Sequence, residues 1–169
     1  AVPAAGLAKS QAMVNYAKEK GAKTAAIISS STPYGQAGSS EVTAAAKEAG
    51  ITIVSSDSFD PSKFDFTNQV SKATSKKPDA LFLYGAGGSG DGLVLKAVAA
   101  SGYQGHIIGN LTYVSTTVPE TAGKDAAAKM VGLSPVDYGA PDADTQKLLD
   151  AYKAKYNELP TVLSVYAYV

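Results

Sequence analysis

Hydroxyl groups and one aromatic side chain follow the first apolar run of the sequence. The run Thr24–Ser29 leads into further hydroxyl residues, among them Ser31, and then into Tyr34. If a helix starts here, its free backbone N–H groups and its dipole could hold a carboxylate or another anion. Tyr34 could form a wall of a ligand site, because tyrosine combines a ring with a polar hydroxyl. The simpler alternative is a solvated turn that caps the helix.

A glycine-rich loop follows the third apolar run. Residues Gly85–Gly90 match the pattern G-x-G-x-x-G, which in dinucleotide-binding proteins places a pyrophosphate on a helix N-terminus. Two observations weigh against a nucleotide: two strand–helix units precede the loop, and the next strand ends at Gly109 and Asn110, where an acidic residue is expected. A tight turn that lets a ligand or a partner lobe approach the backbone also explains the glycines.

Two later loops carry neutral hydrogen-bonding groups and tyrosines. The first covers residues 110–113 and includes Asn110 and Leu111, and the second covers residues 135–138 and includes Asp137. Such groups suit a small polar or aromatic molecule.

Catalytic motifs are weak or absent in the sequence. The one histidine, His106, opens a strand at its amino end, opposite to the usual place of a site. The nucleophile-elbow pattern G-x-S-x-G fails because Asp91 stands where its last glycine is required. Cysteine is absent, which excludes thiolate nucleophiles and thiolate metal ligands. We therefore expect a binding protein and not an enzyme, with no cofactor and no metal.

The composition is that of one globular domain with an ordinary core. The chain has 169 residues, a formal net charge of +0 and 45% hydrophobic residues, which excludes disordered and collagen-like classes. The 15 basic residues are all lysines and are spread along the chain. Sequence-independent nucleic-acid binding needs a basic patch, so we expect no nucleic-acid partner.

The elements that must position these loops are short apolar runs that alternate with amphipathic stretches. Five runs predict strands: Thr24–Ser29, Ile51–Ser55, Asp79–Tyr84, His106–Gly109 and Met130–Ser134. Gly21, Gly50 and Gly102 fall where left-handed helix ends are needed, and Pro78 marks the boundary before the third strand. The pattern predicts an α/β fold, a three-layer αβα sandwich with a parallel, flavodoxin-like sheet. In such a sheet the ligand lies beyond the carboxyl ends of the strands.

The two ends of the chain do not fit a self-contained unit of this kind. An amphipathic helix over residues 4–20 precedes the first strand, and a second helix is predicted for Asp142–Asn157. Residues 160–169 are almost wholly apolar and stop without a polar cap. We expect one lobe of a larger protein, the alternative being a tail docked on its own core.

Several short motifs occur in an order that is familiar. The motifs are Tyr34-Gly35, Asp65-Phe66-Thr67, Pro78-Asp79-Ala80, Lys96-Ala97 and Ser101-Gly102-Tyr103. In this order and spacing the chain resembles the type I periplasmic solute-binding proteins of ABC transporters, and most of all their branched-chain amino-acid (Leu/Ile/Val) branch.

The resemblance implies two α/β lobes that close by a hinge on a small-molecule solute, in a form that a membrane permease recognises. Residues 1–169 would be the carboxyl-side lobe only, with the amino-terminal lobe of the same chain missing. Residues 1–20 would form a hinge-proximal helix, and residues 160–169 would start a helix that returns to the missing lobe. The implied location is periplasmic or extracellular, membrane-associated in a Gram-positive host.

The resemblance carries ligand contacts to five positions. They are Tyr34, Ala86, Gly87, Asn110 and Leu111, and the loop residues Ser31 and Asp137 complete the predicted site.

The family's amino-acid binders place an acidic residue near position 110 to hold the ligand ammonium, and this chain has Asn110 there. An α-amino acid is then expected only if Asp137 supplies the charge, because an unpaired buried ammonium is costly. An aromatic or branched carboxylate, an amide or urea fits better. The alternative functions are a nucleotide-binding enzyme domain that uses Gly85–Gly90 and the sensor domain of a receptor.

Overall fold

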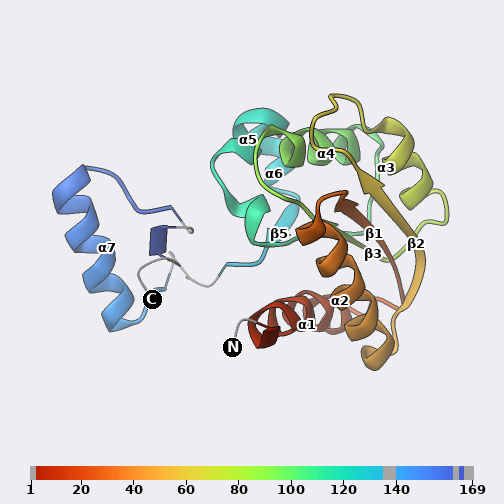
Figure 1. Cartoon of the computed structure of the whole chain (residues 1–169), viewed down its shortest axis with the longest axis horizontal. Coiled ribbons are helices and arrows are strands. Elements are labelled where there is room, and N and C mark those ends of the chain that lie inside the picture. Colours follow the sequence, from red (N-terminus) through yellow and green to blue (C-terminus); the bar gives the residue numbers. More distant parts are fainter. Residues whose placement is uncertain (1–2, 135–139, 162–163, 166–169) are drawn as a thin grey trace. The chain divides into compact units, whose positions relative to one another are not determined.

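The computed structural model describes residues 3–134, 140–161 and 164–165, which fall into two compact units, residues 1–133 and 134–169. The first unit contains one sheet of five parallel strands (Figure 1). The strands are β1 (Thr24–Ser30), β2 (Thr52–Phe59), β3 (Ala80–Tyr84), β4 (His106–Gly109) and β5 (Met130–Gly132). Their order, β2-β1-β3-β4-β5, confirms the predicted flavodoxin-like sheet.

Helices cover both faces of this sheet, as Figure 1 shows. The helices of the first unit are α1 (Pro3–Glu19), α2 (Pro33–Ala49), α3 (Thr67–Thr74), α4 (Ser89–Ala100), the 3-10 turn η1 (Leu111–Val114), α5 (Thr117–Ala122) and α6 (Lys124–Ala127). One core lies between the sheet and α1 and α2, and the other between the sheet and α3 to α6. The central strand β3 contributes side chains to both cores. Phe82 packs in the first core, and Leu81 and Leu83 pack in the second. The three-layer αβα sandwich is therefore confirmed.

Local signals set the helix ends. Thr32 caps α2 by accepting a hydrogen bond from the Gly35 N–H at 3.2 Å. Gly21, Gly50 and Gly102 all have positive φ, as predicted. Before β3, the residue with a positive φ is Lys77, at 49°. It is not Pro78, whose ring fixes its own φ at a negative value.

The second unit contains α7 (Ala143–Tyr156). The helix lies within the predicted range Asp142–Asn157. Asp142 caps its start by accepting a hydrogen bond from the Thr145 N–H at 2.7 Å, and Asn157 ends it in a left-handed conformation. Leu149 is buried, whereas Tyr156 is 53% exposed. Most of the predicted helix 160–169 lies outside the described residues. Among the described helices, none is long and apolar enough to cross a membrane.

Asp79 joins the amino ends of the two central strands. Its Oδ2 accepts three hydrogen bonds, from the N–H of Lys23, the N–H of Thr24 and the hydroxyl of Thr24, each 2.9 Å long. These bonds, first the one from the Lys23 backbone, hold the pKa of Asp79 below its usual range.

We expect Asp79→Asn to lower the melting temperature at pH 7. The difference in melting temperature between parent and variant should become smaller as the solution is acidified. A lowered carboxyl pKa in the folded state stabilises the fold above the ordinary pKa, and this contribution is lost as the pH falls through the folded value. Thermal unfolding of parent and variant at pH 7 and below pH about 3 measures the change. Asp125→Asn, at an exposed carboxylate of α6, is the control. An Asp79→Asn deficit that stays constant over this range would contradict the prediction.

Candidate functional site

The loops that follow β1, β3 and β4 lie at one edge of the sheet, because the carboxyl ends of parallel strands share that edge. The loops of Tyr34, Gly87 and Asn110 follow neighbouring strands of the sheet, although they are far apart in sequence. Within the described residues, three of the predicted loops therefore lie at one edge of the sheet. Asp137 lies outside those residues.

Tyr34 presents an aromatic ring to solvent at this edge. It is 44% exposed, and its ring centroid lies 5.4 Å from that of Tyr84, which is 3% exposed. Burial raises the pKa of the Tyr84 hydroxyl, and the neighbouring Tyr34 adds to the effect. The buried ring thus supports the exposed one, and we call the pair the tyrosine shelf. Ser31 is exposed beside it, and its N–H donates to the Phe59 carbonyl at 2.7 Å.

Asn110 and Leu111 are buried, with exposed fractions of 2% and 8%. Asn110 Oδ1 accepts from the Gly85 N–H at 3.2 Å, and its Nδ2 donates to the Gly85 carbonyl at 3.4 Å. The Asn110 side chain therefore ties the loop after β4 to the loop after β3. Of the predicted contacts, Tyr34, Ser31 and Ala86 are exposed and Gly87 is half-buried, whereas Asn110 and Leu111 pack inside the edge.

Asp91, which the sequence did not single out as a site residue, is fully buried beneath the same loop. Its carboxylate accepts hydrogen bonds from the N–H groups of Ala86 at 3.2 Å and Gly87 at 3.1 Å, and from the Thr112 hydroxyl at 2.5 Å. Burial raises the pKa of Asp91, and these three bonds oppose that rise. Within the described residues, no cation lies within ion-pair distance of this carboxylate.

The glycine motif has an internal explanation. The Asp91 carboxylate occupies the N–H groups of Ala86 and Gly87, so a nucleotide phosphate would have to displace it. A Cβ on Gly85 would overlap the same carboxylate, and one on Gly90 would come within 3.2 Å of the Pro61 carbonyl oxygen. Packing against Asp91 and Pro61 accounts for Gly85 and Gly90, and a positive φ of 95° accounts for Gly87, which does not favour the nucleotide alternative.

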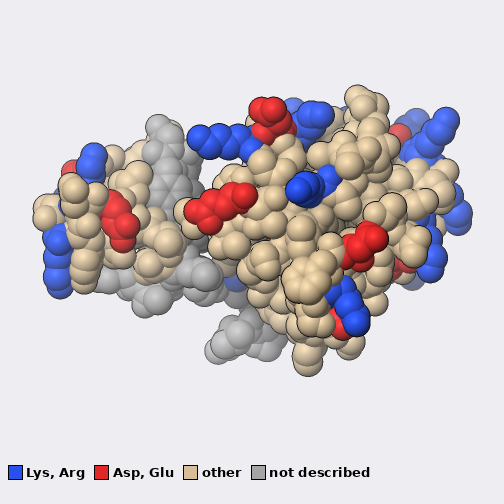
Figure 2. Space-filling view, turned by 90° about the horizontal axis from the view of Figure 1, so that it is seen from above, with Lys and Arg blue, Asp and Glu red and all other residues tan. Residues whose placement is uncertain are grey.

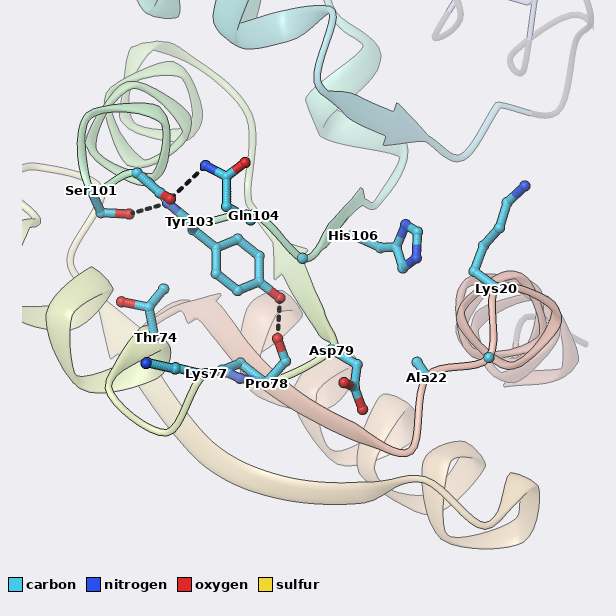
Figure 3. Close-up of a pocket in the computed structure, with 13 residues that line it drawn as sticks. Lys20, Ala22, Thr74, Lys77, Pro78, Asp79, Ser101, Tyr103, Gln104 and His106 are labelled. Atoms are coloured by element: carbon cyan, nitrogen blue, oxygen red, sulfur yellow. Dashed lines mark hydrogen bonds between the residues drawn. The ribbon is translucent and has the colours of Figure 1, made fainter.

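A hollow of about 690 Å³ lies at the opposite, amino edge of the sheet (Figure 3). Its walls come from the ends of α1, α3 and α4, and His106 and Asp79 lie on its rim. Two of its polar side chains bond to backbone carbonyls of the hollow: the Tyr103 hydroxyl donates to the Pro78 carbonyl at 2.8 Å, and Gln104 donates to the Gly102 carbonyl at 2.7 Å. The hollow lies at the edge opposite to the loops of Tyr34, Gly87 and Asn110.

Charged groups do not converge on a catalytic or metal site in the described structure. His106 lies at the amino edge, as predicted, far along the strand from the loop at Asn110. Among the described residues, no group of three His, Asp or Glu side chains could hold a metal ion. On the face seen in Figure 2, lysines and acidic residues are scattered among uncharged residues.

A model of the periplasmic binding protein family matches residues 4–169 of the chain. This chain belongs to that family. The match confirms the family that the motifs indicated, and a comparison with curated proteins finds no match.

Solved structures of the family share the fold. A type 1 periplasmic binding protein from Bordetella pertussis superposes with a TM-score of 0.81 at 22% identity, over 93% of this chain and 44% of that one. The leucine binding protein LivK from Thermotoga maritima superposes with a TM-score of 0.80 at 23% identity, over 94% of this chain and 45% of that one. LivJ from Streptococcus pneumoniae, a branched-chain amino acid transporter substrate binding protein in complex with isoleucine, gives 0.79 at 22% identity, covering 95% and 46%. The chain thus spans less than half the length of these relatives.

Proposed function

We propose that this chain is one lobe of the solute-binding component of an ABC transporter, and that it holds a small organic solute at the carboxyl edge of its sheet. The observation that carries the proposal is the tyrosine shelf, an exposed ring on a buried one, beside a loop with almost no side-chain bulk at Ala86 and Gly87. A flat apolar surface next to accessible backbone suits a small ligand with one apolar and one polar end.

The second half of the site belongs to an amino-terminal lobe of the same protein. Coverage of 44–46% of the related structures supports residues 1–169 as one lobe of a longer protein, and we assign it to the carboxyl side. Residues 1–20 would lie near the hinge, and residues 160–169 would return toward the missing lobe. Closure stabilises the bound state because the ligand contacts both lobes only in the closed form. A membrane permease then recognises that form, in the periplasm or, membrane-associated, outside a Gram-positive cell.

The solute class includes branched or aromatic carboxylates, amides, urea and amino acids. Family membership and the leucine- and isoleucine-binding relatives support this range. A role in binding and not in catalysis is supported by the described edge, where the buried acid Asp91 is held by internal hydrogen bonds.

We expect Tyr34→Ala in the full-length protein to weaken solute binding about tenfold, since loss of one buried aromatic contact is worth about 1.4 kcal/mol. Isothermal titration with branched and aromatic amino acids and the corresponding carboxylates measures the change. Tyr16→Ala is the control, because Tyr16 lies on α1 with its ring 5.4 Å from the ammonium of Lys20, a residue that lines the opposite, amino-edge hollow. Equal affinity of Tyr34→Ala and parent would refute a site at the tyrosine shelf.

A further inference from the structure

We propose that Asp91 turns the loop between β3 and α4 into a hydrogen-bond acceptor surface, so that the solute directs a donor group, an ammonium or an amide N–H, toward Ala86 and Gly87. The inference rests on the solute site proposed above and narrows its ligand. Asp91 acts from beneath the loop, as a specificity-determining residue that the solute does not touch.

The backbone N–H groups of the loop already donate to buried side chains of the same chain. The N–H groups of Ala86 and Gly87 both point to the Asp91 carboxylate, at 3.2 and 3.1 Å. The N–H of the preceding Gly85 is taken by Asn110 at 3.2 Å. Three consecutive backbone donors are therefore unavailable to a ligand anion, which would otherwise be the natural guest of a glycine-rich loop before a helix.

The backbone carbonyl oxygens of the same loop remain available as hydrogen-bond acceptors. Within the described part of the chain, no hydrogen bond reaches the carbonyl oxygens of Ala86 or Gly87. Ala86 is exposed and Gly87 is half-buried, so a bound solute can approach this backbone. Backbone carbonyls left without partners when a cleft closes are costly, and a donor on the solute removes that cost.

The charge of Asp91 favours the same kind of group. Its carboxylate accepts the N–H groups of Ala86 and Gly87, and the single proton of the Thr112 hydroxyl is shared between Asp91 Oδ2 at 2.5 Å and Asn110 Oδ1 at 2.8 Å, an arrangement that an ionised carboxylate can satisfy. It lies in the first turn of α4, whose dipole offsets part of the charge, but no cation of the described residues pairs with it. In a closed cleft of low dielectric, a second anion at the loop is repelled and a cation is attracted.

This placement changes the ligand argument made from the sequence. The sequence has Asn110 after β4, where an acidic partner of an ammonium is expected, and on that ground alone an α-amino acid is not favoured. Asp91 supplies a carboxylate from α4 instead, joined to the loop after β4 by the Thr112 hydroxyl. An amino group on the solute is thus compatible with this edge without Asp137.

The test uses two pairs of probes that differ only in the polar end: 3-methylbutylamine against 3-methylbutanoate, and benzylamine against benzoate. Isothermal titration of the full-length protein, with leucine and phenylalanine alongside, gives the dissociation constants. We expect the amine of any pair that binds to bind at least tenfold tighter than its carboxylate. Equal affinities, or a tighter carboxylate, overturn the inference while leaving the solute site in place. If none of the six compounds binds, this inference is overturned, and titration with urea and acetamide then tests the solute site separately.

Two variants separate the action of Asp91 from a preference set elsewhere. Asp91→Asn removes the charge and should lower the amine-to-carboxylate affinity ratio at least tenfold, whereas Asp125→Asn, an exposed acid on α6, should leave it unchanged. Thr112→Val removes one hydrogen bond to Asp91 but keeps its charge, so the ratio should hold or rise. Equal weakening of amine and carboxylate in Asp91→Asn would show a structural role only and overturn the inference. If Asp91→Asn does not fold, a fall of the ratio in Thr112→Val overturns it instead.

Discussion

We expect Phe82→Ala to lower the free energy of unfolding of the α/β unit by about 3–5 kcal/mol. Phe82 lies in the middle of β3, has no exposed surface and belongs to the core between the sheet and helices α1 and α2. Truncation loses the burial of the ring and leaves a cavity that close-packed neighbours fill only in part. Urea unfolding followed by circular dichroism measures the change as a lower midpoint.

Phe64→Ala is the matched control. Phe64 is 84% exposed, so the same substitution there should change stability by no more than about 0.5 kcal/mol. The two variants remove the same atoms and differ only in burial. A Phe82→Ala midpoint equal to that of Phe64→Ala would mean that β3 is not the centre of a packed core.

The central strands were predictable because burial on both faces makes the sequence apolar throughout. Every residue of β3, Ala80–Tyr84, is buried, and the sequence predicts its extent to within one residue. The edge strand β2 runs to Phe59, four residues beyond the predicted Ser55. Its second half alternates exposed and half-buried polar residues, as an edge strand allows, and such a stretch resembles a loop in a sequence.

The short helices after β4 left no periodic signal. η1, α5 and α6 contain four to six residues each, which is less than two turns. Threonine, valine and proline in α5 also have low helix propensity, so packing of Val118 and Ala126 against the second core decides these elements. The sequence therefore predicts a loop for residues 110–113 and no helix for residues 117–127.

The position of the candidate site on the fold could be predicted, but its internal contacts could not. The carboxyl-edge rule selects the loops after β1, β3 and β4, and the structure places those loops on neighbouring strands. An acid in the first turn of a helix, such as Asp91, ordinarily faces solvent and interacts favourably with the helix dipole. The neighbouring sequence therefore contains no signal that Asp91 is buried. Its burial depends on Gly85 and Thr112, which reach it only in the folded sheet. The role of Tyr84 under Tyr34 is hidden for the same reason.

We expect Gly38→Ala to destabilise the α/β unit by about 2 kcal/mol, although alanine is the better helix former. Gly38 is buried on α2, and a Cβ there would overlap the ring of Tyr84. The ring supports Tyr34 and has no room to move, because Tyr84 is itself 3% exposed. Overpacking costs about 1–3 kcal/mol, which exceeds the gain of up to about 1 kcal/mol in helix propensity. Urea unfolding measures the loss, and Ser40→Ala, at an exposed position of the same helix, should change stability by less than about 0.5 kcal/mol.

A double-mutant cycle identifies the cause. In a Tyr84→Ala background the obstructing ring is gone, so Gly38→Ala should become neutral or stabilising by up to about 1 kcal/mol. The difference between the two backgrounds is the overlap between the Cβ and the ring. An unchanged cost of Gly38→Ala without the Tyr84 ring would assign that cost to the helix backbone instead. A cost that disappears places Gly38 among the residues that build the tyrosine shelf, because only glycine lets Tyr84 pass α2 and lie beneath Tyr34.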